Sequence, residues 1–146
     1  MTIDELRSRV GQEIGVSSWR EITQQQINDF ARVTGDDQWI HIDRERAQGE
    51  SPYAATIAHG FLTVSLLPIF IREAVAVRGR MSINYGFNRL RFPGAVPAGS
   101  RVRARFTLNS MKDVEGGVEI AWGVVIEMEG REKPALVAEW LGRTYR

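Results

Sequence analysis

An acid and a base stand five residues apart in the first third of the chain, directly after a pattern that ends a helix. The helix pattern stops at Gly35, Asp36 follows at once, and His41 completes the pair. Carboxyl and imidazole groups exchange protons near neutral pH, so this pair on a non-helical stretch suits general acid–base chemistry. Taken alone, an aspartate after a helix-ending glycine is more often a turn former, and a single histidine is more often structural.

A second candidate feature, His59-Gly60, opens the longest apolar segment of the chain. Backbone N–H groups at a helix start lack intrahelical partners and can stabilise negative charge on a carbonyl oxygen. The missing side chain of Gly60 would let a ligand approach the backbone closely, although a tight helix entry explains this glycine equally well. For His59 we expect a structural role at the helix N-terminus more than a catalytic one.

Polar residues also occur on a later period-two segment, where Asn84, Tyr85 and Asn88 surround a glycine. They either line a polar part of a pocket or satisfy buried backbone groups. The arginines that alternate with apolar residues nearby are typical of a solvated sheet face, although one or two would suit the phosphates of a coenzyme A carrier. Two unpaired histidines and no cysteine make a poor metal site, so no metal ligand is predicted.

Composition narrows the class of protein. The 146 residues predict a single domain spanning 1–146, and 43% hydrophobic with 25% charged residues are typical of a globular chain. A net charge of +1 argues against non-specific nucleic-acid binding. No signal-peptide core or membrane-spanning run is visible, so we expect a cytoplasmic protein without a membrane partner.

The first half of the chain predicts a short N-terminal helix, with a capping box formed by Thr2 and Glu5 and an end at Gly11, then one strand, a second helix and a long irregular connection. Residues 14–22 alternate loosely and indicate a strand, after which Thr23 is a suitable N-cap for a helix over 24–33. Gly35 should end that helix in a left-handed conformation. From Asp36 to Ala58 there is no sustained periodicity, apart from a short helix near residues 44–47. Connections of this length inside a domain are usually functional.

The second half predicts one helix and four strands. Residues 60–77 are apolar nearly all round, which indicates a buried central helix that Pro68 should kink. Period-two patterns then follow over residues 81–92, 101–111, 118–128 and 135–145. With the early strand these make a five-stranded antiparallel meander that needs an apolar cover. The expected architecture is α+β, a curved antiparallel sheet wrapped around a long central helix, which is the hot-dog fold.

The chain also resembles a known family. The pattern Thr-Gly-Asp-x-x-x-Ile-His-x-Asp over 34–43, followed by Ile-Ala-His-Gly over 57–60, resembles the signature of the MaoC-like (R)-specific enoyl-CoA hydratases, which have a hot-dog fold. The segments 53–60 and 83–93 are closer still to the nodulation-protein-N-like branch. The resemblance runs from about residue 11 to the C-terminus.

The resemblance implies reversible syn addition of water to a trans-2-enoyl-CoA, giving an (R)-3-hydroxyacyl-CoA without a cofactor. His41 would deprotonate the water, Asp36 would handle the proton delivered to the α-carbon, and the Gly60 N–H would stabilise the enolate oxygen. The remaining candidate substrate contacts are Gln38, Trp39, His59, Asn84 and Tyr85. The resemblance further implies a homodimer with the substrate tunnel along its interface, and edge-to-edge pairing would protect exposed strands.

One departure from the family pattern lies between the acid and the base. Most members have an Asn-Pro pair where this chain has Gln38 and Trp39, so an amide is kept and a rigid proline becomes a large aromatic residue. The change leaves the acid–base pair intact and bears on acyl-chain preference. Two alternatives stay open: a hot-dog acyl-CoA thioesterase, and an acyl-binding module that has lost turnover.

Overall fold

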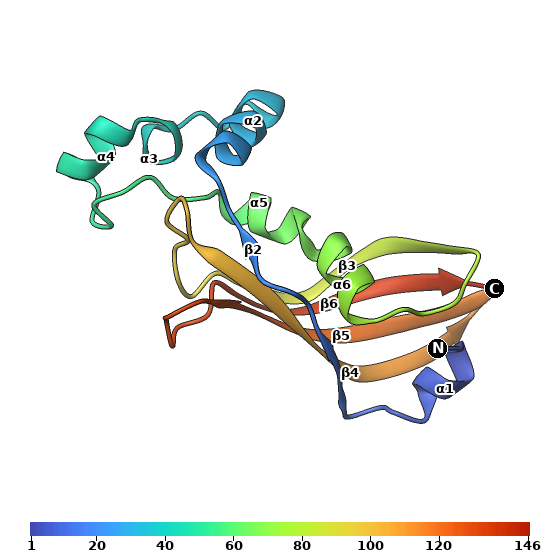
Figure 1. The fold of residues 1–146 in the computed structure, drawn as a ribbon. Helices are drawn as coiled ribbons and strands as arrows, with labels where there is room; N and C mark the ends of the chain where they lie inside the picture. The colour runs from blue at the N-terminus through green and yellow to red at the C-terminus, as the bar shows by residue number, and fades with distance from the viewer.

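The computed structural model describes residues 1–146 and contains one antiparallel sheet with helices on one side and at one end (Figure 1). The helices are α1 (Ile3–Arg7), α2 (Gln24–Thr34), α3 (Trp39–Ile42), α4 (Arg44–Glu50), α5 (Gly60–Ser65) and α6 (Leu67–Ala74). The strands are β1 (Glu13–Val16), β2 (Arg20–Glu21), β3 (Met81–Arg91), β4 (Arg101–Val114), β5 (Gly117–Met128) and β6 (Leu136–Tyr145). No helix is both long and apolar enough to cross a membrane.

The sheet has six strands in the order β1-β4-β5-β6-β3, with β2 also pairing with β4. The expectation of five strands was wrong because the early segment divides into β1 and β2, which meet β4 at two separate places. The expected meander was also wrong. Strand β3 pairs with β6, so after β3 the chain crosses from one edge of the sheet to β4, near the other edge. Strand β3 is therefore an edge strand.

The predicted single helix over 60–77 is two shorter helices, α5 and α6, which meet at Leu66. Pro68 explains the break, since it has no N–H to donate and occupies the first turn of α6, where none is needed. The expected burial on all sides was also wrong. The helix pair covers one face of the sheet and turns its other side outward, leaving the Phe61 side chain 68% exposed.

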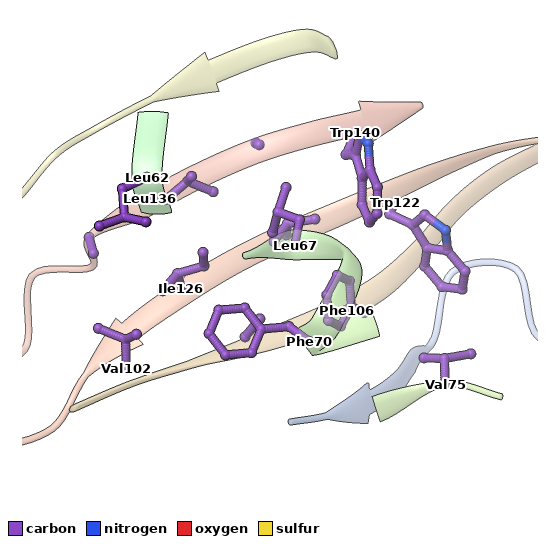
Figure 2. Close-up of a cluster of buried hydrophobic side chains, with 14 of the residues drawn as sticks. Leu62, Leu67, Phe70, Val75, Val102, Phe106, Trp122, Ile126, Leu136 and Trp140 are labelled. Atoms are coloured by element: carbon purple, nitrogen blue, oxygen red, sulfur yellow. The ribbon is translucent and has the colours of Figure 1, made fainter. Parts of the chain in front are cut away.

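The core lies between the helix pair and the concave face of the sheet (Figure 2). Phe70 of α6 is fully buried among side chains of β4 and β5, which include Phe106 and Ile126. Helix α6 lies closest to β4 and β1, with few contacts to β3. The half of the concave face formed by β6 and β3 is therefore left partly uncovered.

The opposite face of the sheet carries the alternating arginines, and these pair with glutamates. Arg103 and Arg105 both donate to Glu127, and Arg101 pairs with Glu129. This matches the interpretation of these three arginines as a solvated sheet face.

Helices α2, α3 and α4 group together beyond one end of the sheet (Figure 1). Helix α2 begins in a capping box, in which the Thr23 hydroxyl accepts from the Gln26 N–H while the Gln26 side chain accepts from the Thr23 N–H. It ends at Gly35, whose φ of 81° is the predicted left-handed conformation. The connection over residues 36–58 is more helical than expected, since α3 and α4 both lie in it.

Candidate active site

Asp36 is positioned by the end of α2. The Gly35 N–H donates to the Ala31 carbonyl, and the left-handed Gly35 then turns the chain out of the helix axis. Asp36 is exposed in the protomer, and its main-chain carbonyl accepts a hydrogen bond from His59 Nε2 at 2.8 Å. The carboxylate is thus brought next to the start of α5, which lies 24 residues further along the chain.

His41 is positioned by α3 and by the strand-like segment before α5. Its ring is 7% exposed, and Nδ1 lies 2.7 Å from the Ile57 carbonyl oxygen. A carbonyl only accepts, so the neutral ring carries its proton on Nδ1 and leaves the Nε2 lone pair free. Burial lowers the pKa of His41, with the Ile57 hydrogen bond acting in the opposite direction. His41 is therefore a neutral base at neutral pH.

His59 lies directly against this pair and is 1% exposed. Its ring stacks on the His41 ring with centroids 3.8 Å apart and an interplanar angle of 24°. The Phe30 ring of α2 packs against His59 at 4.9 Å. Because Nε2 donates to the Asp36 carbonyl, the neutral ring has its lone pair on Nδ1, and that atom is buried without a hydrogen-bond partner.

One ligand atom from each of Asp36, His41 and His59 lies within 4.8 Å of the others, a spacing that also raises the question of a cation site. Two imidazoles on one tetrahedral zinc, with Zn–N bonds of about 2.0–2.1 Å, have ring centroids roughly 5 Å apart. The observed stack, with centroids 3.8 Å apart and ring planes 24° from parallel, is closer than that arrangement. The geometry suits proton transfer better than metal binding.

Gly60 is the first residue of α5, and its N–H has no backbone acceptor. A Cβ at this position would lie 3.0 Å from the Phe92 ring. Gly60 also lines a cavity of about 250 Å³ with Ile57, Thr63 and Phe92. The glycine therefore allows close packing against Phe92, and its role as a backbone donor to the substrate stays a prediction.

Gln38 and Trp39 lie beside the cluster on α3, but no contact ties either side chain to it. Gln38 occupies the N-cap position of α3 without making a side-chain capping bond and is exposed. The half-buried Trp39 ring packs under the Arg46 guanidinium at 4.3 Å. The Asp43 side chain caps α4 by accepting from the Arg46 N–H.

Asn84 and Tyr85 are on β3 and belong to a different cavity from Gly60. Tyr85 lies against the Arg143 guanidinium at 3.6 Å, and the Asn88 side chain donates to Glu139. Asn84 lines two adjoining hollows of about 430 and 490 Å³ between the helix pair and β3, which share Pro68 and Trp140. We name this feature the α6–β3 groove; its walls are residues 64, 65, 67, 68, 71, 72, 75 and 77 on the helix side and 82–87, 120, 122, 140, 142 and 144 on the sheet side.

Sequence reasoning missed the main-chain groups that orient the candidate side chains. The Ile57 carbonyl fixes the His41 tautomer, and the Asp36 carbonyl fixes the His59 ring. It also missed Gln24, whose side-chain amide donates to the His41 carbonyl and so joins the start of α2 to α3. Backbone acceptors carry no residue-type signal, so no motif could have identified them.

Comparison with known proteins supplies the family. The family model described as "MaoC like domain" matches residues 5–128. The chain belongs to the MaoC-like domain family. It is 45% identical to 3-hydroxyacyl-thioester dehydratase Z of Mycobacterium tuberculosis (strain ATCC 25618 / H37Rv) over 97% of this chain and 95% of that protein. It is 42% identical to nodulation protein N of Rhizobium meliloti (strain 1021), over 97% and 89% of the two chains.

A solved structure shares the architecture of this MaoC-like chain. The (R)-hydratase from A. caviae, involved in PHA biosynthesis, superimposes with a TM-score of 0.74 at 21% identity, over 92% of this chain and 96% of that one. The expected α+β hot-dog fold is confirmed, as is the resemblance to the MaoC-like family. The dehydratase relative at 45% identity supports a hydratase or dehydratase activity, that of a hydro-lyase.

Proposed function

We propose that this MaoC-like protein catalyses the reversible addition of water to a trans-2-enoyl thioester, giving an (R)-3-hydroxyacyl thioester. The observation that carries the proposal is the His41 imidazole, which is neutral, has its Nε2 lone pair free, and lies next to the Asp36 carboxylate. A base and an acid on one side of a substrate suit a syn addition. The name of the 45% identical relative, 3-hydroxyacyl-thioester dehydratase Z, points to the same class of thioester.

In the proposed reaction His41 Nε2 takes a proton from a water molecule, and the water oxygen forms a bond to the β-carbon. The electron pair of the double bond moves to the thioester oxygen, where the Gly60 N–H stabilises the enolate. The His41 imidazolium passes its proton to the Asp36 carboxylate, and Asp36 delivers this proton to the α-carbon as the enolate reforms the carbonyl. One water is thereby added, and both side chains return to their starting protonation states. One such backbone donor typically lowers the activation free energy by about 3–4 kcal/mol.

We place the acyl chain in the α6–β3 groove. Its helix-side residues recur every three or four positions from Val64 to Val75, a face about 16 Å long that begins one turn after Gly60. Trp122 and Trp140 are among its sheet-side residues, and no acidic residue lines it. Each buried methylene is worth about 0.8 kcal/mol, so the groove would favour acyl chains longer than crotonyl.

We propose a homodimer formed along β3. This edge strand presents three half-exposed apolar or aromatic side chains, Met81, Ile83 and Tyr85, and its outer backbone edge has no partner strand. Such edges are normally covered. Sedimentation should give the mass of two chains, and Ile83→Lys should reduce it to one. A wild-type protein that sediments as a single chain at micromolar concentration would contradict the dimer.

The activity is tested by incubating the purified protein with crotonyl-CoA. Loss of the enoyl absorbance with formation of the (R)-3-hydroxy product on a chiral column supports the proposal. Release of free thiol without hydration would instead identify a thioesterase. Binding without either reaction would identify an acyl-binding module.

A further inference from the structure

His59 has contacts that the proposed reaction steps do not use. Its ring lies between Phe30 of α2 and His41 of α3, and its own position is the residue before α5. It is therefore the single side chain that touches the segment carrying the acid, the ring of the base and the helix start. This placement suggests that His59 fixes the positions of Asp36 and His41 relative to each other.

The hydrogen bond to Asp36 fixes a segment that has few other restraints. Residues 36–38 are exposed, and the only other bond of the Asp36 main chain is a 3.4 Å contact from its N–H to the Thr34 hydroxyl. The His59 Nε2–H bond to the Asp36 carbonyl is shorter, at 2.8 Å, and comes from a buried ring. Removing it would leave the Asp36 backbone free to move away from α5.

The stack on His41 restrains the rotation of the His41 ring, which the hydrogen bond to Ile57 alone does not prevent. A bond at Nδ1 fixes one point of the His41 ring, and the ring can still swing about that point. The His59 face, 3.8 Å away and within 24° of parallel, sets the plane of the His41 ring. The direction of the His41 Nε2 lone pair is therefore set by Ile57 and His59 together.

The unpartnered Nδ1 of His59 argues that this ring itself does not carry a proton through the cycle. An imidazolium needs acceptors at both nitrogens, and the buried Nδ1 has none. The titratable groups that face it are Asp36 and His41, and a charged His59 would lie face to face with the imidazolium formed on His41. A neutral ring avoids this repulsion.

We propose that His59 is a positioning residue for hydration, which holds the Asp36 main chain and the His41 ring plane and exchanges no proton with the substrate. This inference rests on the proposed function. It predicts that His59 acts on turnover and on the environment of His41, with little effect on substrate affinity.

The test compares His59→Leu and His59→Gln with a stability control, Val102→Ala, which truncates a fully buried side chain on β4. With crotonyl-CoA, His59→Leu should lower kcat about 100-fold, as expected for misplaced reacting groups, while KM changes less than about threefold. His59→Gln, whose amide can still donate to Asp36, should recover part of the loss. Val102→Ala should keep the wild-type kcat below its melting temperature.

A second readout does not depend on turnover. The chain has two histidines, so in a His59 variant the one remaining imidazole signal in an NMR titration is His41. His59→Leu and His59→Gln should each raise the His41 titration midpoint, because the stack and part of the burial are lost. An unmoved midpoint, or a kcat within twofold of wild type in His59→Leu, would overturn the positioning role. An inactive wild type would overturn the proposed function, whereas a raised midpoint would still support the contact between the two rings.

Discussion

The rings of His41 and His59 lie face to face, with centroids 3.8 Å apart, although 18 positions separate them in the chain. The first comes from α3 and the second from the residue before α5. Each ring also donates a hydrogen bond to a main-chain carbonyl near the other histidine. His41 donates to Ile57, two residues before His59, and His59 donates to Asp36, five residues before His41. The irregular connection over residues 36–58 is therefore joined to the start of α5 through the contact between its own His41 and His59.

Replacing either member of the proposed acid–base pair should abolish most turnover. Asp36→Asn and His41→Gln should each lower kcat for crotonyl-CoA hydration by about 100- to 10,000-fold, because each removes one proton-transfer step. Circular dichroism and melting curves should show that both variants remain folded. A rate within tenfold of wild type in either variant would rule out the pair.

The pH dependence of kcat/KM should have an acid limb with its midpoint below 6.5. Burial disfavours the charged form of His41, so its pKa is lowered and the imidazole loses its proton at a lower pH than a free histidine. The base is then fully available at neutral pH and is lost as the pH falls through the lowered value. A limb centred above pH 6.5 would mean that a group other than His41 controls the rate. As a control, the midpoint of the limb is compared with the titration midpoint of His41 measured by NMR.

Gly60→Ala should lower kcat/KM about 100-fold, because the added Cβ would displace either the start of α5 or the thioester group of the substrate. The Cβ would lie 3.0 Å from the Phe92 ring, so packing alone is a competing reason. The double variant Gly60→Ala with Phe92→Leu separates the two. Continued loss in the double variant indicates close approach of the substrate, and full recovery indicates that Gly60 serves only the Phe92 contact.

Filling the α6–β3 groove should change chain-length preference. Ile71→Trp is expected to lower kcat/KM for dodecenoyl-CoA by at least about tenfold, since two lost methylene contacts already amount to about 1.6 kcal/mol. Crotonyl-CoA, which is too short to reach Ile71, should be hydrated as before. The control is Ala76→Trp, an exposed position that lies outside the groove. Equal loss for both substrates would place the acyl chain elsewhere.

Two glycines provide a matched test of the helix end that positions Asp36. Gly35→Ala should destabilise the protein by about 1–2 kcal/mol, because a side chain disfavours the left-handed φ of 81°. Gly49→Ala, within α4 and with open space around it, should stabilise by about 0.5–1 kcal/mol. Urea unfolding measures both. Similar effects of the two changes would contradict the left-handed assignment at Gly35.

Elements that depend on local physics were predictable from the sequence. Thr23 was identified correctly as the N-cap of α2 and Gly35 as its left-handed end, and the period-two strands of the second half were also correct. Pro68 was correctly named as the point of disruption in the apolar helix, although the disruption is a complete break at Leu66. Caps, turns and periodicity act over a few residues, so residue type and spacing are sufficient to reveal them.

Strand order and the contacts of the site were decided by the tertiary structure. Nothing in the pattern of β3 distinguishes pairing with β4 from pairing with β6, because alternation sets the face of a strand and not its neighbour. The sequence supplied Asp36, His41 and His59 as residue types, whereas the stack of the two rings depends on main-chain carbonyls at Asp36 and Ile57. Carbonyls are the same in every residue, so only the folded backbone determines which of them a side chain meets.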